Sequence, residues 1–264
     1  MNLNKIKQEY AENKSLRKTA TLNNVSRVKL TTFLLENSIK IQESKASKKL
    51  QINSNYFNNI DTNEKAYWFG FLTADAYIDE KANTFRLELK KEDKEHLIKF
   101  ATALGVNNYQ PKHRSDRDTY YIGFGDKQIV TDLKKHGLCQ NKSLTTVFPN
   151  LSQNVIKSFI CGYFDGDGTI YGIGKKCVGM AFISTLDMAT KIQEVIKQEL
   201  LITSRIRQVG TKNVYRLEVT KTMNALDIVQ WLYKESSVYL LRKFNKFKTL
   251  QERTSTTTIT QPSL

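Results

Sequence analysis

The sequence has 264 residues, 40% of them hydrophobic, so it can bury a core and is long enough for more than one structural unit. Lys and Arg number 41 against 26 Asp and Glu, which gives a net charge of +15 and a pI near 9.6. This excess favours a polyanionic partner, nucleic acid before a membrane. The alternative is a soluble protein that is simply basic throughout.

The same composition disfavours several classes of protein. The three cysteines and three histidines are scattered, without a CxxC or Cys/His cluster, which argues against a zinc site and a disulfide framework. We expect the histidines in solvent or in loops. The N-terminus is polar, without a signal segment, and no apolar run approaches the roughly 18 residues of a membrane-spanning helix. A soluble protein in a reducing compartment is expected, in the cytoplasm for a bacterial or phage gene or else in an organelle.

Residues 1–45 predict a small helical unit. Asn23 and Asn24 form a turn between two short helices, because Asn tolerates the left-handed backbone of a sharp corner. Ser26 is a candidate N-cap for the second helix, which would run to about Asn37, and a third helix is expected within residues 1–14. The pattern resembles a helix-turn-helix, with an ordinary helical hairpin as the alternative. Its candidate DNA-binding residues are Ser26, Arg27, Val28, Thr31 and Thr32.

Two segments outside the apolar repeats are polar. Residues 46–61 are basic and are predicted to be a linker between the helical unit and the rest of the chain. Residues 251–264 are rich in Thr and Ser and show no periodicity, so a disordered tail is expected.

An apolar helix that ends in an aspartate occurs twice, at residues 67–78 and 159–170. Gly162 and Gly166 lie four positions apart, and so share one face of the second copy. Gly70 and Ala74 do the same in the first copy. Glycine in a helix costs roughly 1 kcal/mol relative to alanine, so small residues paired in this way predict close packing of another backbone. If the two small faces meet, the terminal acids Asp75 and Asp167 come side by side.

The regions around these helices repeat the same order of elements. We predict an α+β fold of two pseudo-symmetric αββαββα repeats, at residues 62–152 and 153–250, which form a saddle whose concave face is built from strands. In the first repeat the expected elements are a strand at 84–90, a helix at 94–104 capped by Asp93, strands at 109–114 and 119–124, and a helix at 126–136. In the second they are a strand at 178–184, a helix to residue 200 capped by Asp187, strands at 206–209 and 214–219, and a helix at 223–233.

Basic residues recur on the strands of both repeats, where they would line the concave face. A β-ribbon fits the major groove of B-DNA and can contact bases there. A solvated sheet face without a ligand is the alternative. The candidate DNA-binding residues are Arg86, Lys90, Lys112, Arg114, Arg205, Arg207, Lys212 and Arg216.

The segments 68–76 and 160–168 resemble the two signature helices of the LAGLIDADG homing endonucleases. The second copy has the glycines and both acids of that signature. The first has Thr73 where an acid is common and Ala76 where glycine is usual. The resemblance implies a two-repeat monomer with Asp75 and Asp167 as catalytic acids.

The resemblance also implies a chemistry. Asp75 and Asp167, together with the adjoining Ala76 and Gly168, would form the site of Mg²⁺, for which Mn²⁺ would substitute. A basic residue is expected near each acid, at Lys142 and Lys243. The implied activity is metal-dependent hydrolysis of both strands of double-stranded DNA at a long, non-palindromic site. Two alternatives use the same scaffold: a non-cleaving DNA-binding regulator, and a maturase that binds intron RNA.

Overall fold

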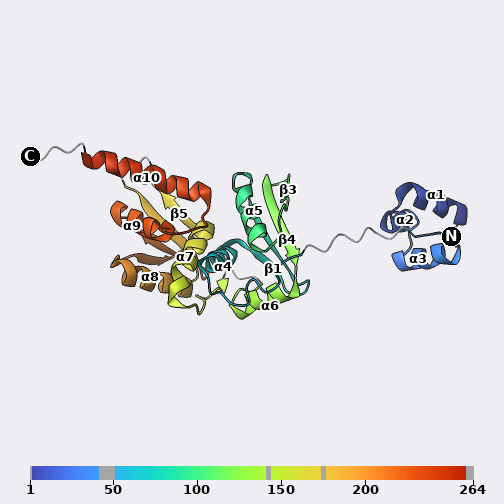
Figure 1. Ribbon diagram of the computed structural model, residues 1–264, viewed down its shortest axis with the longest axis horizontal. Helices are drawn as coiled ribbons and strands as arrows, with labels where there is room; N and C mark the ends of the chain where they lie inside the picture. The colour runs from blue at the N-terminus through green and yellow to red at the C-terminus, as the bar shows by residue number, and fades with distance from the viewer. Residues whose placement is uncertain (1, 42–50, 141–143, 174–176, 260–264) are drawn as a thin grey trace, which may run out of the picture. The chain divides into compact units, whose positions relative to one another are not determined.

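The computed structural model describes residues 2–41, 51–140, 144–173 and 177–259. The chain divides into a unit of residues 1–50 and a larger unit of residues 51–264 (Figure 1). Each unit has its own hydrophobic core. Among the described residues, no helix has the length and apolar character needed to cross a membrane. Lys142 lies outside the described residues.

The smaller unit consists of the three predicted helices. These are α1 (Leu3–Asn13), α2 (Leu16–Leu22) and α3 (Arg27–Glu36). Ser26 caps α3 by accepting a 3.2 Å hydrogen bond from the backbone nitrogen of Lys29, and Asn24 takes the left-handed conformation at the turn. Ile6 and Tyr10 of α1 are buried against Leu30 and Leu34 of α3. The first helix therefore completes a core that the other two could not close alone.

The larger unit contains the αββαββα order twice. The first half comprises α4 (Asn63–Asp75), β1 (Tyr77–Asp79), β2 (Thr84–Lys90), the short 3-10 helix η1 (Lys91–Asp93), α5 (Lys94–Ala103), β3 (Lys112–Arg114), β4 (Thr119–Gly125) and α6 (Lys127–Lys135). The second comprises α7 (Gln153–Asp167), β5 (Gly168–Tyr171), β6 (Gly179–Ser184), α8 (Leu186–Leu200), β7 (Arg205–Gln208), β8 (Tyr215–Val219) and α9 (Thr222–Tyr233), and α10 (Leu241–Ile259) follows it. The predicted α+β class and repeat order are confirmed.

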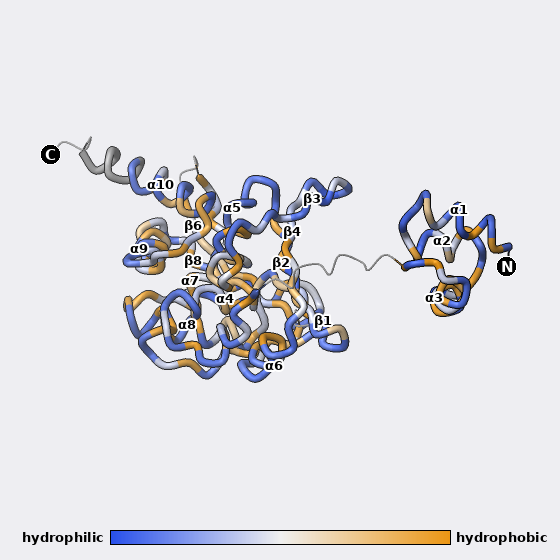
Figure 2. Tube along the Cα trace, turned by 45° about the vertical axis from the view of Figure 1, so that its right-hand side comes forward, coloured by the Kyte–Doolittle hydropathy of each residue, from blue (hydrophilic) through white to orange (hydrophobic). Residues whose placement is uncertain are grey.

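Each half builds an antiparallel sheet of four described strands. The strand orders are β1-β2-β4-β3 and β5-β6-β8-β7, so the two sheets share one topology. In β2 buried residues alternate with more exposed ones, because successive side chains point to opposite faces. The buried face packs on the helices. The two sheets lie on either side of the central pair α4 and α7, where hydrophobic residues gather (Figure 2).

Three predictions of detail are wrong. Residues 51–61 are not linker, because Tyr56, Phe57 and Ile60 are buried in the core of the larger unit. The tail is not disordered from residue 251, since α10 continues to Ile259.

The third concerns helix capping. Asp93 makes no side-chain cap on α5, and Thr185 rather than Asp187 caps α8. Both acids bind other parts of the chain instead. Asp93 pairs with Arg242, and Asp187 accepts a hydrogen bond from the backbone of Phe148.

Candidate functional site

The two signature helices touch through their small residues. A Cβ atom on Gly70 would overlap the carbonyl oxygen of Phe159 on α7, and one on Gly162 would overlap that of Tyr67 on α4. Further along the pair, a Cβ atom on Gly166 would collide with the Cβ of Ala74. All four residues predicted at the helix interface thus lie at the contact.

This contact brings the terminal acids together. Asp75 is the last residue of α4 and Asp167 the last of α7. The Oδ2 atom of Asp75 lies 3.4 Å from the position that a Cβ on Gly166 would occupy, next to Asp167. Burial raises the pKa of the Tyr163 hydroxyl, and the nearby charges of Asp167 and Asp75 raise it further. The charges of both carboxylates therefore reach the same hydroxyl group, that of Tyr163.

Both helices end in extended backbone, at Ala76 and Gly168. Gly168 has a φ of −83°, so it does not use the left-handed conformation typical of a glycine cap. Glycine is needed there for space, because a Cβ atom would overlap the ring and the carbonyl oxygen of Phe164. Ala76 fits at the equivalent place in the first half and is buried.

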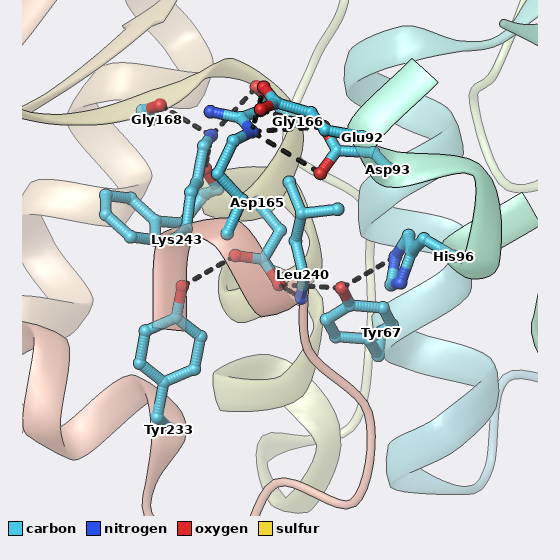
Figure 3. A network of polar contacts seen from close by, with 12 residues as sticks. Tyr67, Glu92, Asp93, His96, Asp165, Gly166, Gly168, Tyr233, Leu240 and Lys243 are labelled. Carbon is cyan, nitrogen blue, oxygen red and sulfur yellow. Dashed lines mark hydrogen bonds and ion pairs between the residues drawn. The ribbon is translucent and has the colours of Figure 1, made fainter. Parts of the chain in front are cut away.

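Lys243 is buried at the C-terminal end of α7 rather than exposed on the surface. Its Nζ donates to the carbonyl oxygens of Phe164, Gly166 and Gly168 at 2.7, 3.0 and 2.6 Å, as Figure 3 shows in part. An ammonium group has three N–H donors, so all of them are used on the last turn of α7. Burial lowers the pKa of Lys243 to about 8, although the charges of Asp165 and Asp75 oppose this shift. A cation at a helix C-terminus stabilises the negative end of the helix dipole.

Asp165 is the centre of a buried hydrogen-bond network that the sequence did not reveal. Its carboxylate accepts hydrogen bonds from the hydroxyls of Tyr67 (2.6 Å) and Tyr233 (2.7 Å) and from the backbone nitrogen of Leu240 (2.7 Å). Figure 3 shows Asp165 between the two tyrosines, with Leu240 beside it. Burial raises the pKa of Asp165 to about 6, and the hydrogen bond from Tyr67 and the charge of Lys243 limit the rise.

His96 extends this network and corrects the expectation that the histidines lie in solvent or in loops, because it is a buried residue of α5. Its Nε2 lies 3.0 Å from the hydroxyl oxygen of Tyr67. Because that hydroxyl donates to Asp165, it accepts from the Nε2–H of His96. Burial lowers the pKa of His96 to about 3, so its ring is neutral.

The basic residues of the first sheet share its outer face. The register pairs Arg86 with Gly123, Lys90 and Arg114 with Thr119, and Lys112 with Tyr121, all on the face opposite the core. The four basic residues predicted in the first repeat therefore lie on one face of this sheet. Arg86 lies over the rings of Tyr77 (5.6 Å) and Tyr121 (5.7 Å). Arg114 instead pairs with Glu88 at 3.2 Å.

The second sheet presents a corresponding face. Arg205, Arg207 and Arg216 lie on it by register, and the exposed Lys212 is in the turn between β7 and β8. Glu218 pairs with Arg207 at 3.3 Å and with Arg216 at 2.9 Å. Each face therefore carries several cations around one carboxylate.

Hollows lie beside both acids. One of about 390 Å³ is lined by Asp75, Tyr77, Arg86 and Lys90 among others. Another of about 210 Å³ is lined by Asp167 together with neutral groups that include the side chains of Thr73 and Tyr163. The surroundings of the two acids therefore differ in charge, as the two halves differ in sequence.

The donor set suits a hard divalent cation. In the described ranges no group of three or more His, Cys, Asp or Glu side chains could hold a metal. Mg²⁺ commonly binds through one or two carboxylates and takes its other ligands from substrate phosphates and water. Two carboxylates at the ends of α4 and α7 fit that pattern.

The α3 residues predicted to contact bases are mostly exposed. Arg27, Val28 and Thr32 face solvent, and Val28 is 76% exposed. Thr31 is half-buried, and its hydroxyl donates to the carbonyl oxygen of Arg27 at 2.8 Å. Ser26 is exposed although its hydroxyl caps the helix.

Comparisons with known proteins agree with this arrangement. Residues 154–230 match a protein family described as a LAGLIDADG-like domain. No curated protein matches the sequence.

Solved structures share the fold at low sequence identity. The LAGLIDADG homing endonuclease I-LtrWI bound to target DNA is similar over 77% of this chain and 92% of its own, with 15% identity and a TM-score of 0.50. Meganuclease I-SmaMI bound to uncleavable DNA covers 71% of this chain and 88% of its own, with 11% identity and a TM-score of 0.50. The LAGLIDADG homing endonuclease I-GzeII in complex with its DNA target has the same coverage and TM-score, with 12% identity. Residues 154–230 thus match a LAGLIDADG-like domain, and the chain shares the fold of the LAGLIDADG homing endonucleases.

Proposed function

We propose that this chain is a site-specific DNA endonuclease that makes metal-dependent double-strand breaks by phosphodiester hydrolysis. One observation carries the proposal: the glycine-mediated contact of α4 and α7 brings Asp75 and Asp167 together between two exposed, cation-bearing sheet faces. A stabilising role alone does not account for carboxylates at two helix C-termini, where the helix dipole disfavours negative charge.

The carboxylates of Asp75 and Asp167, with Ala76 and Gly168 beside them, would hold Mg²⁺, and Mn²⁺ would substitute. A divalent ion bound there supplies charge neutralisation on the phosphate and activation of an attacking water. Lys243 contributes through position: its three hydrogen bonds fix the turn that presents Asp167. Lys142 is proposed as the basic residue of the first half.

The sheet faces would bind double-stranded DNA along the major groove. Arginine and lysine contact phosphates and guanine edges, so the two faces supply both affinity and sequence recognition. The structurally similar endonucleases were solved with bound DNA. Since the two faces differ in sequence, the site is expected to be non-palindromic and the active form a monomer. The exposed residues of α3 would extend the contact.

The deciding experiment is cleavage of a plasmid library with genomic inserts, in Mg²⁺ and in EDTA. We expect Mg²⁺-dependent double-strand breaks at rare sites. Asp75→Asn and Asp167→Asn should each lose at least about 100-fold in rate while still binding DNA, because each removes an ionised ligand. Asp227→Asn, at an exposed acid of α9, is the matched control and should cleave normally.

The experiment also separates the two alternatives. Tight DNA binding without cleavage, by folded protein supplied with metal, would replace the proposal with a non-cleaving regulator. Preferential binding of a structured intron RNA over duplex DNA would replace it with a maturase.

A further inference from the structure

Two acids at equivalent places in the halves each bind the tail of the opposite half. Asp93, just before α5, is 4% exposed and accepts from Nε (3.1 Å) and Nη2 (3.0 Å) of Arg242, which lies at the start of α10. Asp187 in α8 accepts a 2.7 Å hydrogen bond from the backbone nitrogen of Phe148, in the segment that follows the first half. The two halves are therefore tied together reciprocally, outside the α4–α7 contact.

The tie to Asp93 is part of a short strap, residues 239–243. The ring of Tyr239 lies 5.7 Å from the ammonium of Lys99 on α5. Leu240 donates its backbone N–H to Asp165. Through these consecutive residues the strap thus touches the first half at α5 and the last turn of α7.

Its last two residues complete the connection. Arg242 pairs with Glu92 (3.1 Å) as well as with Asp93, and Lys243 holds the last turn of α7. Figure 3 shows Glu92 and Asp93 of the first half close to Lys243 and Gly166 of the second. The strap therefore links the first half to the turn that presents Asp167.

The strap adds contacts between the halves away from the closest approach of α4 and α7. That approach follows one line of small residues, Gly70, Ala74, Gly162 and Gly166, and the hydrogen bond from Tyr67 to Asp165 also joins the two helices. Contacts away from that line would fix the angle between the two helices, and with it the angle between the two sheets. A buried carboxylate such as Asp93 is stable only when it is paired, so its bond to Arg242 holds the strap in one place.

We propose that Arg242 and Asp93 are positioning residues that fix the angle between the two sheets. The guanidinium geometry matters, because Nε and Nη2 of Arg242 both donate to Oδ2 of Asp93, and such a planar fork restricts orientation more than an ammonium does. The consequence for DNA cleavage rests on the proposed function: the angle sets where both basic faces lie relative to Asp75 and Asp167.

The first test measures the angle in the full-length protein without DNA. Spin labels are placed at Lys127→Cys on α6 and Gln198→Cys on α8, both exposed, with the exposed Cys139 and Cys177 changed to Ser. Pulsed electron–electron double resonance then measures the distance between the two spin labels, one in each half. We expect one narrow distribution for this background.

Four changes are compared in that background: Arg242→Gln, Arg242→Lys, Asp93→Asn, and the double change Asp93→Asn with Arg242→Gln. The double variant removes the pair without leaving a buried charge, which keeps the test valid where a single variant fails to fold. Each is expected to broaden or shift the distribution, Arg242→Lys the least. Lys134→Gln, which breaks an ion pair with Glu80 inside the first half, should leave it unchanged.

An unchanged distribution in folded Arg242→Gln and in the double variant would overturn the proposal. The second arm measures single-turnover cleavage and DNA affinity. Misplacing a catalytic group by about 1 Å can cost on the order of 10²-fold in rate, so the variants should lose more in cleavage rate than in DNA affinity. If unmodified protein never cuts DNA but the distances respond, the proposed function fails while the positioning role stands.

Discussion

A Cβ atom on Gly162 would overlap the carbonyl oxygen of Tyr67 and lie 2.9 Å from the backbone nitrogen of Phe71. The obstacle is the backbone of α4, which cannot rotate aside as a side chain can. Gly162→Ala must therefore push the two helices apart, and we expect it to lower the free energy of unfolding by about 3 kcal/mol or more. Urea unfolding followed by circular dichroism measures this.

Gly123→Ala provides the control for that substitution. A Cβ there would lie 3.5 Å from the carbonyl oxygen of Phe85, which is an ordinary contact. Replacing glycine by alanine also reduces the conformational freedom of the unfolded chain, which favours the folded state. Its effect should stay within about 1 kcal/mol. Equal stability of the two variants would show that the helices do not depend on this close approach.

The pH dependence of stability should reveal Asp165. Burial raises its pKa from 3.8 to about 6 in the folded protein. The folded state therefore holds this proton more tightly than the unfolded chain, so the stabilising contribution is complete below about pH 4 and is lost as the pH rises past about 6. The contribution of Asp165 to the free energy of unfolding therefore changes by about 3 kcal/mol at most between low and high pH.

Asp165→Asn has no such titration. We expect the stability of the unmodified protein, relative to this variant, to fall between pH 4 and pH 7. Chemical unfolding of both proteins at matched pH values gives the difference and cancels the contribution of other carboxylates. A difference that does not vary with pH would mean that folding leaves the pKa of Asp165 unchanged.

Much of the fold could be predicted because its signals are local. Alternation of apolar and charged residues at 84–90 specifies a strand with one buried face, and the small residues of the signature helices specify where those helices meet. Because the same order of helices and strands occurs in both repeats, each assignment in one repeat supported the corresponding assignment in the other. Asn24 and Ser26 fixed the corner and the cap of the N-terminal unit through their own backbone chemistry.

The remaining features depend on contacts that are distant in sequence. Asp93 and Asp187 both precede or begin a helix, so local rules assigned them as caps, whereas their partners are Arg242 and Phe148. Asp165 lies two positions before Asp167, which points it about 200° around the helix and into the interior. Its partners come from three other segments, and no spacing rule identifies them.

The arginines of the first sheet should contribute unequally to DNA binding. Arg86 is held over the rings of Tyr77 and Tyr121, and among the described residues it forms no ion pair that DNA would have to break. Arg114 must first give up its pairs with Glu88 and Asp116. We expect Arg86→Ala to cost about 1–3 kcal/mol of binding free energy and Arg114→Ala clearly less, in fluorescence anisotropy with the cognate duplex. Equal losses would show that the ion pair does not compete with DNA.

The N-terminal unit should add affinity without altering the cleavage chemistry. Because it has its own core, residues 51–264 are expected to fold alone. Loss of the basic unit removes phosphate contacts, so affinity should fall and its dependence on salt should become shallower.

Within the full chain, Arg27→Ala at the exposed start of α3 should weaken binding about tenfold, whereas Lys7→Ala on α1 should not. Anisotropy titrations over a range of salt concentrations give both quantities. Unchanged affinity and salt dependence in the shortened chain would assign α3 a role other than DNA contact.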